Sequence, residues 1–400
     1  MKLSLSNLRY TAESDGVQLN PEARILAVAG DPGGAAALAP VLAALQKGRR
    51  VRVEARPYRQ AQNVWRKWGL ECEALDETCS SHRISQLLED LQPSLLLCGT
   101  SINGVDLEKS FIDAARGFGV PSMGLLDFWS NYTPRFSDHR GNLTVLPDLI
   151  GVMDSQAREQ MIAEGFPAAK LCVTGQPAFD CLENQRREFS AARRETLRAS
   201  LGVETHDHLV VFVSQPLAAM YGPNSSCAQN HPGYNEHKVL QLVVSALEKI
   251  SEETAAKITL AVRPHPRERA EDFLGLASPR IQIRLAREQS AHELVLSADL
   301  VAGMSSALLV EACYLGCVTL SLQPGLQTSD VLPTNVLGVT RAVYRSDEVL
   351  PAIRDVMLSP MTRQAMQKGL ASFQTDGRAT ERVLDRVFEL MGQPVAAIQS

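Results

Sequence analysis

Short apolar runs alternate with longer amphipathic stretches along this chain, and the pattern starts afresh near its middle. The first apolar run covers residues 24–30, and a second series begins at residues 208–213. Apolar runs of this length indicate buried strands, and the amphipathic stretches between them indicate the helices of βαβ units. Since 400 residues exceed what one typical core holds, we expect an α/β protein with two Rossmann-like parallel-sheet domains of similar size.

The predicted domain boundaries follow breaks in this pattern. Residues 1–23 are polar and irregular, which indicates an N-terminal extension. A Gly-Gln-Pro turn at residues 175–177 interrupts the alternation. We therefore expect the first domain at residues 24–176 and the second at residues 177–375. Residues 376–400 are expected to form a C-terminal helix and tail.

Composition and charge argue against several classes of function. The chain has 40 basic and 45 acidic residues, a formal net charge of −5, which is unlike a broad nucleic-acid-binding surface. No apolar run approaches the ~18 residues of a transmembrane helix, and the N-terminus lacks the apolar core of a secretory signal, so a cytoplasmic location is expected. The eight cysteines form no CxxC pair and no DxD motif ends a strand, so neither a metal nor a cofactor is expected. The sequence is compatible with a homodimer.

Two polar motifs follow apolar, strand-like runs in the second half of the chain. "RPHP" at residues 263–266 follows one run, and "GMSS" at residues 303–306 follows another and opens a helical stretch. Because the carboxyl ends of parallel strands point at one crevice, the two motifs should lie together. A cation, an imidazole and hydroxyls at a helix start suit a phosphate group. The expected nucleotide and phosphate ligands are Arg263, His265, Gly303, Met304, Ser305 and Ser306, with Ser214 and Gln215 after a neighbouring strand.

Each of these residues also has a plain structural alternative. His265 lies between two prolines and could cap a turn, and Ser305 or Ser306 could simply cap the following helix. Glu311 lies farther along that helix among apolar residues, where ribose hydroxyls would be good partners, although an exposed helix acid is equally consistent. The loop at residues 221–237 is rich in Gly, Pro, Asn and Ser and could close over a bound donor.

The first domain offers carboxylates rather than phosphate ligands. Its first strand runs into Asp31, Gly33 and Gly34, which form neither a dinucleotide nor a P-loop fingerprint. The glycines would let the backbone approach a ligand, and Asp31 is either a general base or a helix cap. Asp127 ends a later strand and is the second candidate base. Both are favoured over Glu108, which suits a helix start. Further cleft or acceptor contacts are expected from Thr100, Ser101, Trp129, Tyr132 and Arg135, the tryptophan being equally suited to the core.

Parts of the chain resemble known enzymes. The segments "RPHPRE" and "ADLVAGMSSALLVEACYLGCVTLSLQPG" look like the nucleotide-binding domain of GT-B-type glycosyltransferases, and the UDP-N-acetylglucosamine 2-epimerases share this architecture and a similar "VTG" junction. The His-Pro and Ser-Ser pairs are similar to those of bacterial sialyltransferases and CDP-glycerol glycerophosphotransferases. The resemblance spans residues 30–325 and implies a GT-B-like fold whose two domains face a central cleft. It further implies that His265, Ser305 and Ser306 hold donor phosphates and that Glu311 contacts the ribose.

The resemblance does not extend to a complete catalytic set. The sialyltransferases carry an acidic pair before a glycine, which this chain lacks at a strand end. The epimerases carry a His-Arg motif after the first strand of the second domain, where this chain reads Ser214-Gln215-Pro216.

We therefore expect a metal-independent glycosyltransferase that moves a glycosyl group from a UDP- or CMP/CDP-linked donor to an acceptor hydroxyl or amine. Its partners would be these small molecules. Asp31 or Asp127 would act as base, and His265 would stabilise the leaving phosphate. The first alternative is a hydrolysing sugar-nucleotide 2-epimerase on the same fold, which needs no acceptor. The second is a non-catalytic partner protein that keeps the nucleotide site.

Overall fold

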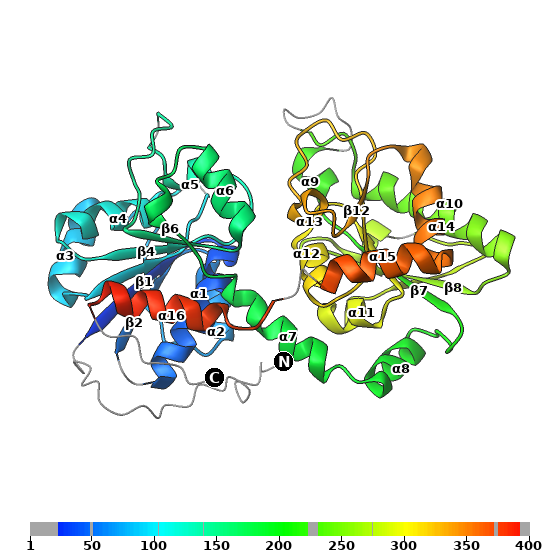
Figure 1. Cartoon of the computed structure of the whole chain (residues 1–400), viewed down its shortest axis with the longest axis horizontal. Helices are drawn as coiled ribbons and strands as arrows, with labels where there is room; N and C mark the ends of the chain where they lie inside the picture. Colours follow the sequence, from blue (N-terminus) through cyan, green and yellow to red (C-terminus); the bar gives the residue numbers. More distant parts are fainter. Residues whose placement is uncertain are drawn as a thin grey trace. The chain divides into compact units, whose positions relative to one another are not determined.

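The computed structural model shows two compact units (Figure 1). Unit 1 comprises the chain up to Asp180 together with the part from Asp376 on, and unit 2 comprises Cys181–Thr375. Each unit contains one six-stranded sheet, so the predicted α/β class with two Rossmann-like domains is confirmed. The structure describes residues 23–48, 51–102, 104–138, 140–222, 231–273, 275–371 and 375–392.

Unit 1 holds a parallel sheet with the strand order β2-β1-β3-β4-β5-β6. The order reverses between β1 and β3, and in open α/β sheets ligands bind beyond the carboxyl ends of the strands at such a switch point. The strands are β1 (Arg24–Ala29), β2 (Arg52–Pro57), β3 (Leu95–Cys98), β4 (Ser122–Leu125), β5 (Leu149–Val152) and β6 (Leu171–Val173).

Helices cover both faces of this sheet. They are α1 (Pro32–Gly48), α2 (Ala61–Lys67), α3 (Ser81–Leu91), α4 (Leu107–Gly117), α5 (Tyr132–Phe136), α6 (Ser155–Ala163) and α16 (Ala379–Leu390), with short 3-10 turns at Ala168–Lys170 and Pro177–Phe179. Side chains alternate along β1, so Ile25 and Ala27 pack with α1, α2 and α16, whereas Leu26 and Val28 pack with α3 and α4. Figure 1 shows α16, coloured red, beside α1.

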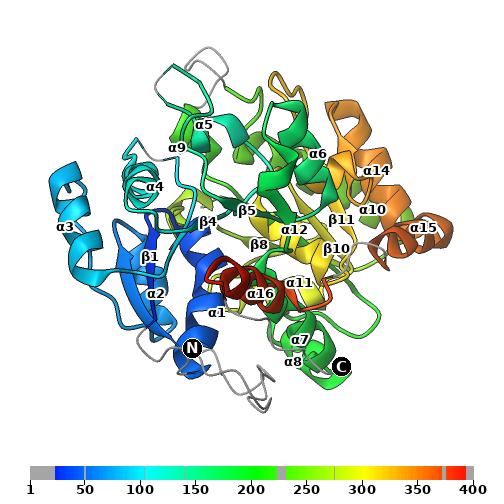
Figure 2. The same ribbon diagram turned by 60° about the vertical axis from the view of Figure 1, so that its left-hand side comes forward.

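Unit 2 holds a second parallel sheet, with the order β12-β11-β10-β7-β8-β9. The order reverses between β7 and β10, which places this unit's switch point there. Figure 2 shows β8, β10 and β11 of this sheet. The strands are β7 (His208–Val213), β8 (Ile258–Arg263), β9 (Gln282–Leu285), β10 (Leu300–Gly303), β11 (Thr319–Leu322) and β12 (Arg341–Val343).

A large apolar cluster covers one face of the sheet of unit 2. Alternate residues of the strands, among them Val210, Phe212 and Leu260, pack there against Leu247 and Ile353. The helices are α7 (Asp180–Glu188), α8 (Ala191–Ser200), α9 (Leu217–Tyr221), α10 (Glu236–Thr254), α11 (Ala291–Ser297), α12 (Ala307–Tyr314), α13 (Pro333–Val336), α14 (Val349–Leu358) and α15 (Pro360–Ala371), with 3-10 turns at Ala270–Phe273 and Ser346–Glu348.

Three segments need separate description. The charged stretch at residues 182–202 forms two helices, because Ser190 caps α8 by accepting a hydrogen bond from the Arg193 amide at 3.2 Å. Residues 72–75 form an extended segment that pairs with the outer side of β2 through the amides of Glu73 and Leu75. Of the expected lid at residues 221–237, the part at 223–230 lies outside the described residues.

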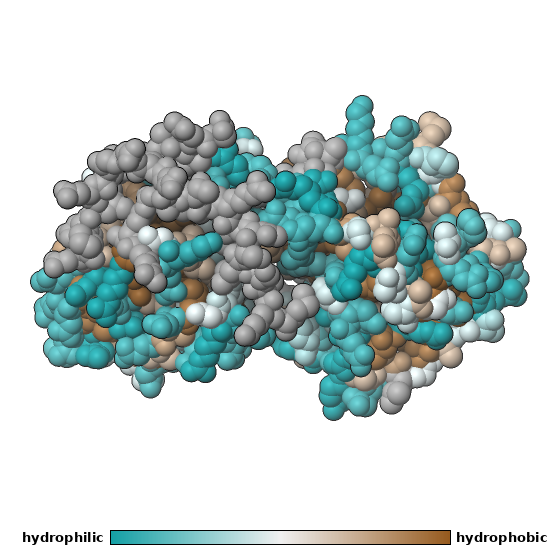
Figure 3. All heavy atoms as spheres, turned by 90° about the horizontal axis from the view of Figure 1, so that it is seen from below, coloured by the Kyte–Doolittle hydropathy of each residue, from teal (hydrophilic) through white to brown (hydrophobic). Residues whose placement is uncertain are grey.

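In the part of the chain that the structure describes, no helix is both long and apolar enough to cross a membrane. On the face drawn in Figure 3, hydrophobic residues lie scattered among hydrophilic ones.

Candidate functional site

The switch point of unit 2 brings the predicted "GMSS" motif together with Gln215, the predicted ligand after β7. Gln215 follows β7, and Ser305 follows β10. The Gln215 Oε1 accepts a hydrogen bond from the Ser305 backbone N–H at 2.8 Å. This contact joins the two strand ends between which the strand order reverses, as the strand-end argument expects for neighbouring loops.

Ser306 shapes the turn from β10 into α12. It is the N-cap of the helix, with an extended backbone (φ −81°, ψ 150°), and its hydroxyl accepts a hydrogen bond from the Leu309 N–H at 3.3 Å. Gly303 permits close packing, since a Cβ there would lie 3.2 Å from the Val213 carbonyl oxygen. The Met304 side chain is buried in the core. The helix start therefore directs backbone N–H groups beyond the sheet edge, where an anion is favoured.

A buried carboxylate connects the ends of β7 and β8. Glu268 accepts hydrogen bonds from the Ser214 hydroxyl at 2.8 Å and from the His265 N–H at 2.6 Å. Burial raises the pKa of Glu268. Burial and then the charge of Arg267 lower the pKa of His265, whose Nδ1 accepts the Arg267 N–H at 3.1 Å. Because Nδ1 accepts this hydrogen bond, the neutral ring carries its proton on Nε2, and that N–H can donate to a phosphate oxygen.

Two predicted ligands already have protein partners. The Nη1 atom of Arg263 donates to three carbonyl oxygens between residues 286 and 289, at 2.8–2.9 Å, and burial lowers the pKa of Arg263. The carboxylate of Glu311 lies 2.9 Å from His292 Nε2, and His292 Nδ1 lies 2.6 Å from Gln185. These contacts orient both side chains from within unit 2. The phosphate role of Arg263 and the ribose role of Glu311 stay predictions.

Sequence reasoning missed a polar network beyond β11 and β12. The Tyr234 hydroxyl donates to Gln323 at 2.9 Å, and the hydroxyl of Tyr344 and the amide of Asn335 each donate to Asp330 at 2.7 Å. Burial opposes ionisation of Asp330, but these and other hydrogen bonds outweigh it and lower its pKa. The same strand-end rule would have identified Gln323 after β11 and Tyr344 after β12.

In unit 1 the switch point lies where β1 and β3 end. Asp31 follows β1, and Ser101 follows β3. The Ser101 hydroxyl accepts the Asp31 N–H at 3.0 Å, and the Asp31 carboxylate accepts the N–H of Ile102 at 3.1 Å. The loop between β1 and α1 is thus fixed to the loop between β3 and α4. Gly34 packs against the backbone of that second loop, where a Cβ would lie 3.3 Å from the Gly99 Cα.

Asp127 follows β4, and its side chain lies beside the start of α1. Its carboxylate faces Gly33, where a Cβ would overlap the Asp127 Oδ2, so a larger residue would have to displace the carboxylate or the start of the helix. The Arg135 Nη1 lies 2.5 Å from Asp127 Oδ1 and also donates to the Thr100 carbonyl at 2.7 Å. The Gln176 amide donates to the Asp127 carbonyl at 2.9 Å. Of the predicted first-domain residues, Asp127, Gly33, Thr100 and Arg135 therefore form one cluster beside Asp31.

The two aromatic residues proposed for the acceptor site are buried. Trp129 is 6% exposed, and its indole N–H donates to Asp154 at 2.6 Å. Tyr132 is 3% exposed, and its hydroxyl donates to Gln160 at 2.6 Å. Burial leaves little of either ring for a ligand to contact. The signal that the sequence offered, aromatic residues after a strand-end carboxylate, is equally typical of a core.

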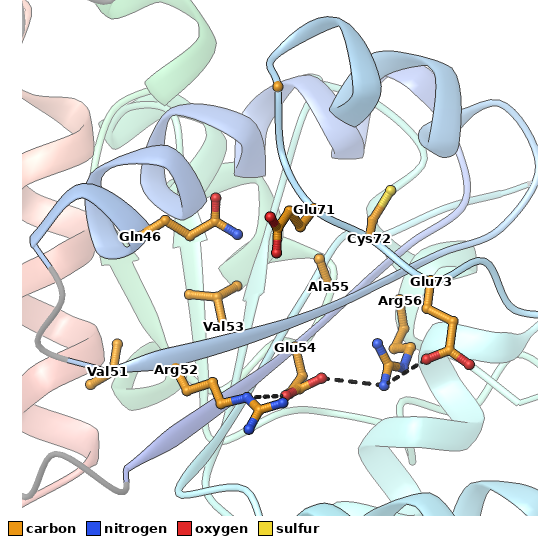
Figure 4. Close-up of a pocket in the computed structure, with 11 residues that line it drawn as sticks. Gln46, Val51, Arg52, Val53, Glu54, Ala55, Arg56, Glu71, Cys72 and Glu73 are labelled. Atoms are coloured by element: carbon orange, nitrogen blue, oxygen red, sulfur yellow. Dashed lines mark ion pairs between the residues drawn. The ribbon is translucent and has the colours of Figure 1, made fainter.

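A hollow of about 770 Å³ lies along β2 of unit 1, away from these clusters (Figure 4). Four of its five charged lining residues pair with one another: Arg52 with Glu54, and Arg56 with both Glu54 and Glu73. The fifth is Glu71. None of the predicted site residues lines the hollow.

Comparison with known proteins extends these observations. Residues 139–387 match the family model for UDP-N-acetylglucosamine 2-epimerase. Among curated protein sequences, none matches. Three solved structures share the fold. UDP-GlcNAc 2-epimerase from Neisseria meningitidis bound to UDP-GlcNAc has 14% identity and a TM-score of 0.64, over 92% of this chain and 100% of its own. S. aureus MnaA with UDP has 15% identity and a TM-score of 0.64, over 94% and 99%. A glycosyltransferase from Rickettsia africae has 10% identity and a TM-score of 0.63, over 93% and 99%.

At these identities the structural likeness concerns the fold, which glycosyltransferases and epimerases share. The family model is more specific, and it matches more than half of the chain, from residue 139 in unit 1 through the whole of unit 2 and into α16. By that match the chain belongs to the UDP-N-acetylglucosamine 2-epimerase family.

Proposed function

We propose that the protein binds a UDP-N-acetylhexosamine and inverts the configuration at C2 of the sugar. The observation that carries this proposal is the family match over residues 139–387. The match favours the epimerase alternative over the glycosyl transfer that the sequence first indicated. Epimerisation needs no acceptor.

Unit 2 would hold the nucleotide. The start of α12, with Ser305 and Ser306, offers backbone N–H groups and hydroxyls, and the neutral His265 offers its Nε2–H. These are neutral hydrogen-bond donors that suit the diphosphate and stabilise negative charge as it develops on a leaving UDP. Glu311 would accept from the ribose hydroxyls, with His292 orienting its carboxylate.

The chemistry follows from the position of the inverted carbon. The C2 hydrogen of a hexose is not acidified by a carbonyl group, so its removal requires a leaving group at C1. A carboxylate takes the C2 proton, the C–H electrons form a C1=C2 double bond, and the C1–O electrons leave with UDP. Water or UDP then adds at C1 while a proton returns to the opposite face of C2. With water, the net reaction consumes one water and releases UDP and the epimeric free sugar.

Asp127 and Asp31 are the candidate bases for the proton transfers. Asp127 is half-buried and held in one orientation by Arg135 and by the glycine opposite it. Fixed geometry of this kind is what general acid–base catalysis requires. Asp31 is held by backbone contacts to the neighbouring loop.

Glycosyl transfer remains a second candidate because of one departure. After β7 the chain reads Ser214-Gln215-Pro216, where related epimerases carry a His-Arg motif. A chain without these groups could use the same nucleotide site to deliver the sugar to an acceptor hydroxyl.

Turnover of UDP-GlcNAc in D₂O without an acceptor distinguishes these reactions. We expect UDP release or a C2-epimeric product, with deuterium from the solvent at C2, followed by proton NMR. Asp127→Asn should remove the exchange, whereas Asp148→Asn, a carboxyl that hydrogen-bonds the amide and hydroxyl of Ser122, should retain it. Turnover only with an acceptor and without deuterium would establish transfer. No turnover of the wild-type protein in either case would overturn both.

A further inference from the structure

Glu108 is a buried carboxylate that the proposed reaction does not use. It lies in the first turn of α4, beneath the switch point of unit 1, and is 3% exposed. Among the described residues it forms no ion pair with a lysine, arginine or histidine. Because burying an unpaired charge is costly, a carboxylate in this place needs strong compensation from hydrogen-bond donors.

That compensation comes from three separate segments. Oε1 accepts the Gly30 N–H at 3.0 Å and the Ser101 hydroxyl at 2.5 Å, and Oε2 contacts the Tyr58 hydroxyl. Gly30 follows β1, Tyr58 follows β2, and Ser101 follows β3. One side chain therefore joins the loops beyond three adjacent strands. Burial raises the pKa of Glu108 despite these donors.

The contacts continue from Glu108 to a candidate base. The Ser101 hydroxyl, which donates to Glu108, also accepts the N–H of Asp31 at 3.0 Å. The Asp31 carboxylate is held in turn by the N–H of Ile102. Two residues farther on, Gly33 faces the Asp127 carboxylate. The position of the loop from Gly30 to Gly34 therefore depends on Glu108 at one end and meets Asp127 at the other.

We propose that Glu108 is a positioning residue that sets the β1–α1 loop, and with it Asp31 and Gly33, against Asp127. Its burial keeps it from touching a substrate, so it acts through the loop. As a role in turnover, this proposal rests on the proposed function of the same site. As a statement about the loop, it is independent of the reaction.

The Tyr58 hydroxyl suggests which substitution is tolerated. It contacts Glu108 and also lies 3.2 Å from the Val105 carbonyl oxygen. In Glu108→Gln the amide oxygen can still accept from Gly30 and Ser101, while the new N–H₂ donates to Tyr58, which turns its proton to Val105. In Glu108→Ala the three donors lose their acceptor.

The first measurement separates kcat from KM in the full-length protein with UDP-GlcNAc. We expect Glu108→Ala to lower kcat by about 10²-fold, as misplaced catalytic groups do, with KM changed by no more than about twofold. Glu108→Gln should recover most of the loss. The matched control is Asp148→Asn, because Asp148 also accepts from a backbone amide and a serine hydroxyl, but at the amino ends of β4 and β5. Wild-type kcat in Glu108→Ala, or an equal loss in the control, would overturn the proposal.

The second measurement does not depend on turnover. Hydrogen exchange of the Gly30 and Asp31 amides should be faster in Glu108→Ala than in the wild type, while the core amide of Val28 stays protected. If Glu108→Ala does not fold, Ser101→Ala tests the hydrogen bond to the Asp31 amide, and Glu108→Gln tests the contacts of the carboxylate itself. Unchanged exchange at both amides would refute the positioning role even if the protein turns over UDP-GlcNAc. Faster exchange would support the positioning role even if the protein does not turn over UDP-GlcNAc.

Discussion

Gln215 in unit 2 and Glu108 in unit 1 occupy comparable places, since each binds the loop beyond a neighbouring strand at its switch point. The side chains differ in charge. A neutral amide beside the start of α12 avoids repelling a phosphate, whereas a carboxylate there would oppose it. In unit 1 the carboxylates of Asp31, Asp127 and Glu108 lie around the switch point. At the residue scale, this difference supports the proposal that unit 2 binds the diphosphate and that unit 1 supplies the base.

Gly33 gives this arrangement a direct test. In Gly33→Ala the new Cβ overlaps Asp127 Oδ2, so the carboxylate or the start of α1 must move. We expect kcat to fall by about 10²-fold, while UDP affinity, a property of unit 2, changes by no more than about twofold. Gly117→Ala is the control, since no heavy atom lies within 4 Å of its Cβ, and alanine there should retain activity. An equal loss of UDP affinity in Gly33→Ala would contradict the separation of roles.

Single residues also show how far the sequence could lead. The approach of Gln215 to Ser305 follows from both ending neighbouring strands, and that rule is visible in the sequence. The contacts of Arg263 and Glu311 are not visible in the sequence, because their partners come from segments that only the folded chain brings near. Long side chains choose between such partners and a ligand by geometry, which periodicity does not encode. Glu108 was passed over for the same reason.

Helices and strands were predictable where the spacing of apolar residues agrees with the Gly, Pro and polar residues that bound each run. The apolar runs at residues 24–30 and 208–213 form β1 and β7, because buried parallel strands read as continuous apolar runs. The edge strand β12 has only three residues, and α14 and α15 were not expected. The sequence also gave no indication that α16 packs on unit 1, since that contact joins residues far apart in the chain.

Asp180 provides the cap that α16 lacks in its own sequence. Its two oxygens accept the N–H groups of Ala379 at 2.9 Å and Thr380 at 2.7 Å, whereas the N-cap residue Arg378 makes no side-chain cap. In Asp180→Ala both buried N–H groups lose their acceptor. We expect the free energy of unfolding of unit 1 to fall by about 1–3 kcal/mol.

Urea unfolding followed by tryptophan fluorescence measures this change, because all three tryptophans belong to unit 1. Asp113→Ala is the control, since it removes only an exposed ion pair with Arg116 and should cost less than about 1 kcal/mol. A midpoint for Asp180→Ala equal to that of the control would show that α16 is capped in another way.

At the scale of the whole molecule, the two units have separate cores. The large apolar cluster of unit 2 contains only its own residues, and the two clusters of unit 1 draw on β1 to β4 and on α16. Separate cores of this size can unfold in separate transitions. The tryptophans at positions 65, 68 and 129 make fluorescence a reporter of unit 1 alone, whereas circular dichroism follows both units.

This difference leads to a prediction about ligand binding. A ligand that binds only the folded state raises stability by about 2.7 kcal/mol at 100 times its dissociation constant. If UDP binds at the start of α12, it should raise the thermal transition of unit 2, seen by circular dichroism, and leave the fluorescence transition of unit 1 in place. Amide protection should increase at residues 214–217 and 303–309, and not along β2. Ser306→Ala should reduce the shift, because it loosens the helix start that holds the phosphate. An equal shift of the fluorescence transition would place the principal UDP contacts in unit 1, and the absence of any shift would remove the nucleotide from the proposal.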